Sequence, residues 1–232
     1  MPHHLDRPAT LGAPFAEALQ SMHAGQPQLG ADGRQHAIDD TTRISEQEGM
    51  TLFRLGVETK VTATLEVGLA YGFSTVYLLA ALDHNGGGSH TAIDPFQATD
   101  WSGIGLTTAT TLVRAASDLT IDSFTHIEER SDAALIDLAR EGRTFGLTFI
   151  DGYHRFDDVL VDFTLAARMC PVGGVIVLHD MWLDSIAAVA SFLRWNRFDF
   201  AEITTGCDNL FAARRVGADL RNWDHFVEFP LR

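Results

Sequence analysis

Short apolar segments of strand length alternate with longer amphipathic segments of helix length between residues 62 and 195, and this alternation constrains the fold more than any single motif. The strands are predicted at residues 62–67, 91–94, 123–127, 145–150 and 175–178. The helices are predicted at residues 74–82, 106–116, 132–140, 156–169 and 185–195. Strands that are joined through helices run parallel, and a parallel sheet needs helices on both faces to bury it.

A capping box and a closing hairpin mark the limits of the predicted domain. Ser45 followed by Glu48 is typical of a helix N-terminus. Residues 198–204 and 209–213, separated by a glycine turn, predict an antiparallel hairpin at the edge of the sheet. We therefore predict a doubly wound, Rossmann-like α/β sheet of seven strands over residues 45–215, mostly parallel with one antiparallel strand.

The two ends of the chain lie outside this pattern. Residues 1–44 are rich in His, Pro, Gly, Gln and Asp, and are predicted to form an N-terminal arm or cap with a short helical segment. Residues 216–232 are predicted to form a C-terminal tail, for which Trp223 and Phe226 are the candidate packing anchors.

Composition and charge exclude several classes of partner. Because the formal net charge is −14, unaided binding to a nucleic-acid backbone is not expected. No apolar run approaches the roughly 18 residues of a membrane helix, and the N-terminus lacks the apolar core of a secretory signal. Cys170 and Cys207 stand alone, which is typical of a reducing compartment. We expect a cytoplasmic protein.

A glycine turn follows the first predicted strand and carries the strongest local signal. Glu66 and Gly68 end the strand, and Gly72 and Ser74 begin the next helix, so backbone N–H groups face the carboxyl edge of the sheet. The second strand ends at Asp94, which could accept hydrogen bonds from two ribose hydroxyls. Tight packing between strand and helix would also explain the glycines, whose G-x-x-x-G spacing differs from that of dinucleotide-binding proteins.

Four motifs in order along the chain are similar to those of a known family. They are Glu66-x-Gly68-x-x-x-Gly72-x-Ser74, Ala92-Ile93-Asp94, Phe149-Ile150-Asp151-Gly152-x-His154 and Gly173-Gly174-Val175-Ile176-Val177-x-His179-Asp180. The set resembles class I S-adenosylmethionine-dependent methyltransferases, and within them small O-methyltransferases of the catechol type and those that act on antibiotic sugars. The resemblance extends over roughly residues 44–215 and implies a role for each motif residue.

The resemblance implies that the cofactor S-adenosylmethionine lies along the first two motifs. Its methionine part would lie over Gly68 and Gly72, with its amino group toward Glu66 and its carboxylate toward Ser74, its ribose on Asp94 and its adenine beside Ser131 and Asp132. Asp151 would end the fourth strand next to the sulfonium and the methyl acceptor.

The resemblance places His154 where catechol-type enzymes have a lysine general base. An imidazole with a pKa near 6.5 can accept a hydroxyl proton at neutral pH, so the substitution is chemically sensible. Alternatively, His154 only caps the helix that begins near residue 156.

Metal-dependent relatives place a divalent cation at the positions of Asp151, His179 and Asp180. Mg²⁺ or Mn²⁺ is the cation implied, and an imidazole ligand favours a transition metal over Mg²⁺. Alternatively, His179 is a buried histidine that only forms hydrogen bonds beneath the site.

The sequence thus predicts methyl transfer from S-adenosylmethionine to a hydroxyl of a small-molecule or sugar acceptor, with a homodimer as the expected assembly. A nicotinamide-dependent oxidoreductase is the alternative enzyme, because it shares the acidic end of the second strand. The third hypothesis is a protein without enzymatic activity, in which a methyltransferase-like fold serves only as a binding or scaffolding module.

Overall fold

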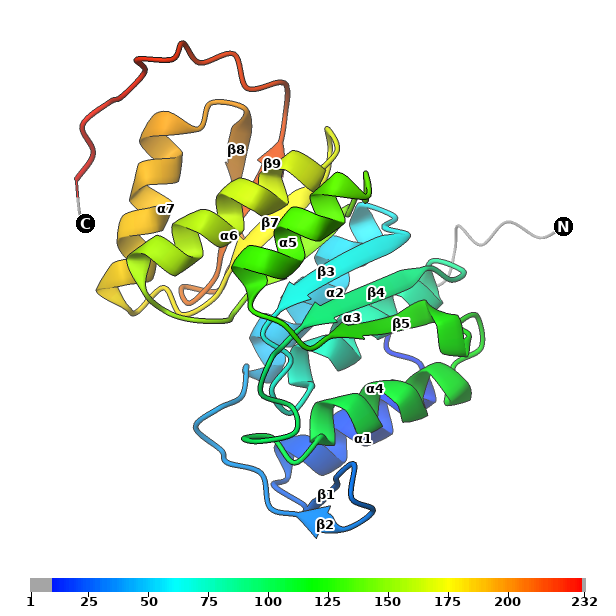
Figure 1. The fold of residues 1–232 in the computed structure, drawn as a ribbon. Helices are drawn as coiled ribbons and strands as arrows, with labels where there is room; N and C mark the ends of the chain where they lie inside the picture. Colours follow the sequence, from blue (N-terminus) through cyan, green and yellow to red (C-terminus); the bar gives the residue numbers. More distant parts are fainter. Residues whose placement is uncertain (1–9, 231–232) are drawn as a thin grey trace, which may run out of the picture.

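A seven-stranded sheet forms the centre of the computed structural model, which describes residues 10–230 (Figure 1). Its strand order is β5-β4-β3-β6-β7-β9-β8, in which β9 alone runs antiparallel to its neighbours. The strands are β3 (Ala63–Val67), β4 (Ser89–Ile93), β5 (Phe124–Ile127), β6 (Leu147–Ile150), β7 (Val175–Leu178), β8 (Phe200–Ile203) and β9 (Phe211–Arg215). This arrangement confirms the predicted fold class, including the closing hairpin.

Helices cover both faces of this sheet (Figure 1). One layer contains α2, α3 and α4, and the other contains α5, α6 and α7. The helices are α1 (Ala13–His23), α2 (Glu46–Glu58), α3 (Phe73–His84), α4 (Ile104–Ala115), α5 (Ser131–Arg140), α6 (Phe156–Met169) and α7 (Asp184–Asn196), with a short 3₁₀ helix at Ile121–Ser123. The capping box of Ser45 and Glu48 begins α2 as predicted.

The N-terminal segment folds onto the first layer. The helix α1 buries Phe15, Leu19 and Met22 against α3 and α4, because these residues share one face of the helix. A short hairpin of β1 (Gln28–Leu29) and β2 (Gln35–His36) follows, which the sequence pattern does not predict. The first nine residues of the predicted arm lie outside the described part of the chain.

The tail packs on α7, but not through the residues first expected. Trp223 is 97% exposed, and Phe226 is 65% exposed and meets the ring of Phe229 within the tail itself, so the prediction that these two residues anchor the tail is wrong. Instead, the buried Asn196 side chain donates to the Val227 carbonyl at 2.9 Å and accepts the Val227 N–H at 2.8 Å. The Phe229 ring contacts Phe192 with the two centroids 5.5 Å apart. The side-chain amide of Asn196, bonded to the backbone of Val227, and the Phe229 ring therefore hold the tail.

The carboxyl ends of the parallel strands meet at one edge of the sheet, where a cavity of about 1070 Å³ opens. Such an edge is where open α/β sheets bind their ligands, because the loops from neighbouring strands diverge there. Within residues 10–230, no helix combines the length and the apolar character that crossing a membrane requires.

Candidate active site

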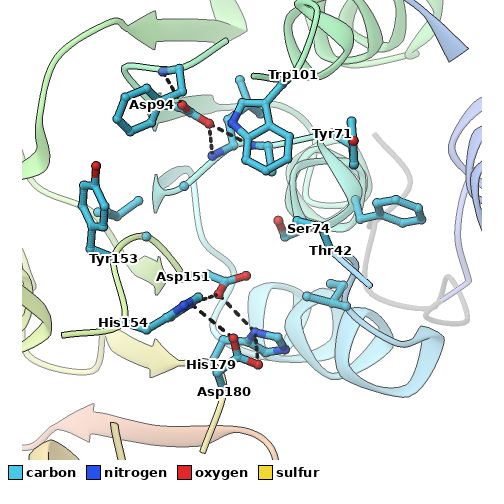
Figure 2. A pocket seen from close by; sticks show the side chains of 18 of the residues that line it. Thr42, Tyr71, Ser74, Asp94, Trp101, Asp151, Tyr153, His154, His179 and Asp180 are labelled. Atoms are coloured by element: carbon cyan, nitrogen blue, oxygen red, sulfur yellow. Dashed lines mark hydrogen bonds and ion pairs between the residues drawn. The ribbon is translucent and has the colours of Figure 1, made fainter. Parts of the chain in front are cut away.

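Two groups of polar side chains lie at opposite ends of the cavity (Figure 2). Asp94 lies at one end, near the rings of Tyr71 and Trp101. His154 lies at the other end, among Asp151, His179 and Asp180. We call these the Asp94 end and the His154 end. Residues 41–44, from the segment before α2, complete the lining.

The turn between β3 and α3 requires glycine at two positions, because of both its backbone conformation and its close packing. Gly68 and Gly72 have φ angles of +94° and +87°, which side chains of L-amino acids rarely adopt. A Cβ atom on Gly68 would also overlap the backbone carbonyl oxygen of Asp151. A Cβ on Gly72 would lie 3.2 Å from the Gly105 Cα. Only glycine therefore preserves the conformation of this turn. At Gly68, only glycine also preserves the contact between the ends of β3 and β6.

The Asp94 carboxylate, after β4, is 4% exposed and accepts hydrogen bonds from the glycine turn. Its Oδ2 accepts the backbone N–H groups of Leu69 and Ala70 at 3.1 and 2.8 Å, and the Gln97 amide at 3.1 Å. Within the described residues, its Oδ1 accepts a single bond, from the Phe96 N–H at 2.7 Å. Since each carboxylate oxygen offers about two acceptor positions, Oδ1 is the atom that can bind a ligand hydroxyl.

Glu66 lies below the turn rather than on the cavity wall. It is completely buried, and its Oε2 accepts hydrogen bonds from the Thr75 hydroxyl and from Nε2 of His90, the latter at 3.2 Å. Its Oε1 has no partner among residues 10–230. A buried oxygen of this kind is often satisfied by an ordered water, so a contact with a ligand amine would run through one.

The remaining predicted cofactor residues divide between the cavity and the surface. Ser74 and Ser131 lie in the first turns of α3 and α5, and both line the cavity. Asp132 instead accepts a hydrogen bond from the exposed Arg130 guanidinium at 3.2 Å. The Arg130 guanidinium also lies 5.5 Å above the Tyr153 ring, which closes this side of the cavity.

His154 faces two carboxylates rather than the helix that follows it. Its Nε2 lies 3.4 Å from Oδ1 of Asp151 and 3.2 Å from Oδ2 of Asp180. The N-cap residue of α6 is Arg155, and no side chain caps that helix. The hydrogen bond to Asp151 raises the pKa of His154 above its ordinary value, and burial opposes this shift without cancelling it. The ring therefore faces two carboxylates and does not cap the helix.

Asp180 adopts an uncommon backbone conformation with φ of +59°. Its Oδ1 accepts the indole N–H of Trp182 at 2.9 Å, and its Oδ2 faces His154. Both carboxylate oxygens are thus held by neighbouring side chains. Such a conformation costs free energy and persists only where the surroundings fix it.

The structure brings together a set of metal-compatible groups that differs from the predicted one. Ligand atoms of Asp151, His154 and Asp180 all lie within 4.8 Å of one another, and two carboxylates with one imidazole fit a divalent cation. His179 lies beside this set, with its Nδ1 3.1 Å from Oδ1 of Asp151. The same Nδ1 lies 3.3 Å from Oδ1 of Asp180, so Asp151, His179 and Asp180 also lie close together, and that set stays a prediction.

His179 is surrounded by acidic groups. It is 7% exposed, and its Nε2 lies 3.5 Å from Oε1 of Glu48, on the side opposite Asp151. Burial lowers the pKa of this imidazole, but the carboxylates of Asp151, Glu48 and Asp180 outweigh that effect and raise the pKa to about 10. The ring is therefore a cation at neutral pH. Burial likewise raises the pKa of Asp151, yet the charge of His179 and hydrogen bonds from both histidines lower it overall.

Glu48 and Asn209 belong to this site, although the sequence analysis did not assign them to it. The Asn209 amide donates to Oε1 of Glu48 at 2.8 Å, and its nitrogen lies 3.2 Å from Nε2 of His179. The sequence signal for Glu48 was its capping box, which explains only one of its two oxygens. Asn209 carried no signal at all.

Comparison with known proteins places the fold and the cavity in one family. A family model described as a methyltransferase domain matches residues 65–181, half of the chain, and this match includes both ends of the cavity. The chain is a class I S-adenosylmethionine-dependent methyltransferase. The oxidoreductase alternative finds no support in this match. A comparison of the methyltransferase with curated protein sequences gives no match.

Solved structures with the same fold cover nearly the whole methyltransferase. The O-methyltransferase TomG of Streptomyces achromogenes, involved in tomaymycin synthesis and in complex with SAM, has a TM-score of 0.62 at 19% identity, covering 90% of this chain and 92% of its own. An O-methyltransferase of Bacillus cereus in complex with SAH has a TM-score of 0.62 at 16% identity, covering 92% and 93%. A SAH-bound methyltransferase of Podospora anserina has a TM-score of 0.64 at 11% identity, covering 89% of each chain.

Proposed function

We propose that this methyltransferase binds S-adenosylmethionine along the Asp94 end of the cavity and transfers its methyl group to a hydroxyl of a small molecule held at the His154 end. The observation that carries the proposal is His154, whose Nε2 faces Asp151 and Asp180 at the cavity wall. The similar folds of two O-methyltransferases, one in complex with SAM and one with SAH, support the cofactor and the acceptor atom.

The free acceptor positions at the Asp94 end suit this cofactor. Oδ1 of Asp94 accepts a ribose hydroxyl, and Ser74, in the first turn of α3, lies where helix N–H groups favour a carboxylate. Ser131 borders the adenine, while Asp132 remains in its ion pair with Arg130. Glu66 reaches the amino group through water, because its free Oε1 is buried beneath the turn.

When bound, the cofactor supplies a methyl group on a sulfonium, and the protein must hold an acceptor oxygen in line with it and remove the proton. His154 can remove this proton at Nδ1, which makes no hydrogen bond within residues 10–230. Its Nε2–H then donates to Asp151 and Asp180, which orient the ring and stabilise the imidazolium that forms. The gain from holding both reactants in contact adds to the effect of the base.

The same carboxylates could hold a divalent cation as a further cofactor. Asp151, His154 and Asp180 are the residues that would bind it, and the imidazole favours Mn²⁺ over Mg²⁺. Such an ion would orient acceptor oxygens and lower the pKa of the reacting hydroxyl. It would also compete for the His154 nitrogen that faces the carboxylates, so the metal and base roles of this ring are alternatives.

Methyl transfer to probe acceptors tests the proposal. Labelled methyl from S-adenosylmethionine is offered to catechol and to L-rhamnose, with aniline as the nitrogen-containing control acceptor. We expect labelling of a hydroxyl probe, and a decrease of about 100- to 10,000-fold in turnover in His154→Ala while S-adenosylhomocysteine still binds. His36→Ala, in the β2 hairpin, should behave as the wild type. Unchanged turnover in His154→Ala, or labelling of aniline alone, would contradict the proposal.

A further inference from the structure

Glu48 caps the N-terminus of α2 with one of its two carboxylate oxygens, and the other oxygen is available for further contacts. Its Oε2 accepts the Ser45 backbone N–H at 2.6 Å, which completes the capping box of α2. Its Oε1 accepts the Asn209 amide at 2.8 Å and lies 3.5 Å from Nε2 of His179. The Glu48 carboxylate is thus shared between the start of a helix and the His154 end of the cavity.

The burial of Glu48 indicates that its contacts with Asn209 and His179 matter beyond the helix cap. Glu48 is 8% exposed, whereas a glutamate that only caps a helix can keep its free oxygen in water. A buried carboxylate costs free energy unless charged or polar groups surround it. Burial raises the pKa of Glu48, but hydrogen bonds from His179, Ser45 and Asn209 lower it overall to about 2. The carboxylate therefore remains ionised against the His179 ring.

Packing fixes α2 in the position that these contacts need. The neighbouring Gly49 lies directly against the ring of Tyr77 in α3, where any Cβ atom would overlap the ring. On its other side, α2 contacts the loop between β8 and β9. Gln47 donates to the Gly206 carbonyl at 2.9 Å, and Asn209 in the same loop bonds to Glu48. These contacts hold α2 between α3 and the loop.

We infer that Glu48 is a positioning residue for methyl transfer, which is itself held by the Asn209 amide and holds His179 so that its Nδ1–H faces Asp151. Asp151 then presents Oδ1 to both histidines, with Nδ1 of His179 at 3.1 Å and Nε2 of His154 at 3.4 Å. The inference rests on the proposed function, because it assigns Glu48 an indirect effect on the proton acceptor His154. Glu48 itself does not line the cavity.

Three variants in α2 separate positioning from capping. Glu48→Gln keeps a capping box, since glutamine also serves at this position, but it removes the charge beside His179. Ser45→Ala breaks the cap and leaves the Oε1 contacts of Glu48 in place. Glu46→Gln removes a charge from the exposed part of the same first turn and is the matched control.

The readouts are the denaturation midpoint, the affinity for S-adenosylhomocysteine, and the ¹³Cε1–¹H resonances of His179 and His154 at one fixed pH. For a hydroxyl probe that the wild type methylates, kcat and KM are added. In Glu48→Gln we expect both resonances to shift and kcat to fall by up to about 100-fold, with the midpoint, KM and cofactor-product affinity near wild type. In Ser45→Ala we expect a lower midpoint and unchanged resonances.

Each outcome decides between the inference and the proposed function. Unmoved resonances of His179 and His154 in Glu48→Gln would overturn the positioning role, as would the same shifts in Glu46→Gln. A lower midpoint in Glu48→Gln without these shifts would show a capping role alone. Failure of the wild type to bind S-adenosylhomocysteine would instead contradict the proposed function, and the resonances would still report whether Glu48 positions His179.

Discussion

The two ends of the cavity satisfy their carboxylates in different ways. At the Asp94 end, three of the four groups that donate to the carboxylate are backbone N–H groups, from Leu69, Ala70 and Phe96. At the His154 end, Asp151 and Asp180 face the imidazoles of His154 and His179. Backbone donors keep their charge state at every pH of interest, whereas an imidazole such as that of His154 can gain or lose a proton. One end therefore presents fixed donors to its carboxylate, and the other presents a histidine that we propose moves a proton.

The glycine turn should show the largest effect of any single change at the Asp94 end. In Gly68→Ala the added Cβ meets the Asp151 carbonyl at a φ of +94°, so we expect destabilisation of about 3 kcal/mol or more and loss of S-adenosylhomocysteine binding. Urea denaturation and calorimetric titration measure the two effects. Gly142→Ala has a φ of +70° but no atom within 4 Å, and should cost only about 1 kcal/mol. Equal destabilisation of Gly68→Ala and Gly142→Ala would show that backbone conformation alone, and not packing against Asp151, requires glycine in the turn.

Substituting one carboxylate at each end should separate binding from turnover. Asp94→Asn directs an amide toward groups that are themselves donors, so we expect S-adenosylhomocysteine affinity to fall by about 10- to 100-fold. Asp180→Asn should leave this affinity within about threefold, because its contacts with His154, His179 and Trp182 all lie at the His154 end, and should lower turnover instead. A loss of S-adenosylhomocysteine affinity in both variants would contradict the assignment of cofactor binding to the Asp94 end alone.

The pH dependence of turnover should report the proton that His154 carries. The hydrogen bond to Asp151 raises the pKa of His154 above 6.5, so the ring is protonated, and unable to act as a base, below that shifted value. We expect turnover to rise about tenfold per pH unit up to a midpoint above 6.5 and then to level off. The S-adenosylhomocysteine affinity should stay flat over the same range. A midpoint below 6.5 would contradict the base assignment.

The smallest expected effect concerns Asp162 of α6, whose side chain is buried near Ser131, a residue that lines the cavity. Burial raises the pKa of Asp162 to about 6, so the folded state binds an extra proton between about pH 4 and pH 6, and stability falls as pH rises through that window. Asp162→Asn should therefore be more stable than the wild type above pH 6, by about 1–2 kcal/mol, and similar to it below pH 4. Denaturation of this variant and of the exposed Asp157→Asn control at both pH values measures the difference.

The same contrast explains how much could be predicted from the sequence. The Asp94 end consists of residues close together in the chain around β3 and β4, so the spacing of Gly68, Gly72 and Asp94 predicts it. Asp151, His154 and Asp180 were also found, because each follows a parallel strand at the same edge. That His154 also lies within reach of both carboxylates could not be predicted, since it depends on side-chain orientation.

The contacts that the sequence did not predict connect distant segments. Glu48 and Asn209 are 161 residues apart and meet only because β9 inserts beside β7 and brings its loop against α2. The capping box gave Glu48 a complete local explanation, so nothing in the pattern suggested a second role. The tail shows the same limit, because a buried Asn196 and the backbone of Val227 hold it in place of the apolar Trp223.

Calorimetric titration of S-adenosylhomocysteine into chelator-treated protein tests the central claim most directly. The account predicts saturable one-to-one binding without added metal, weakened in Asp94→Asn and retained in His154→Ala. It would be contradicted by the absence of binding to the wild type, or by an equal loss of affinity in both variants.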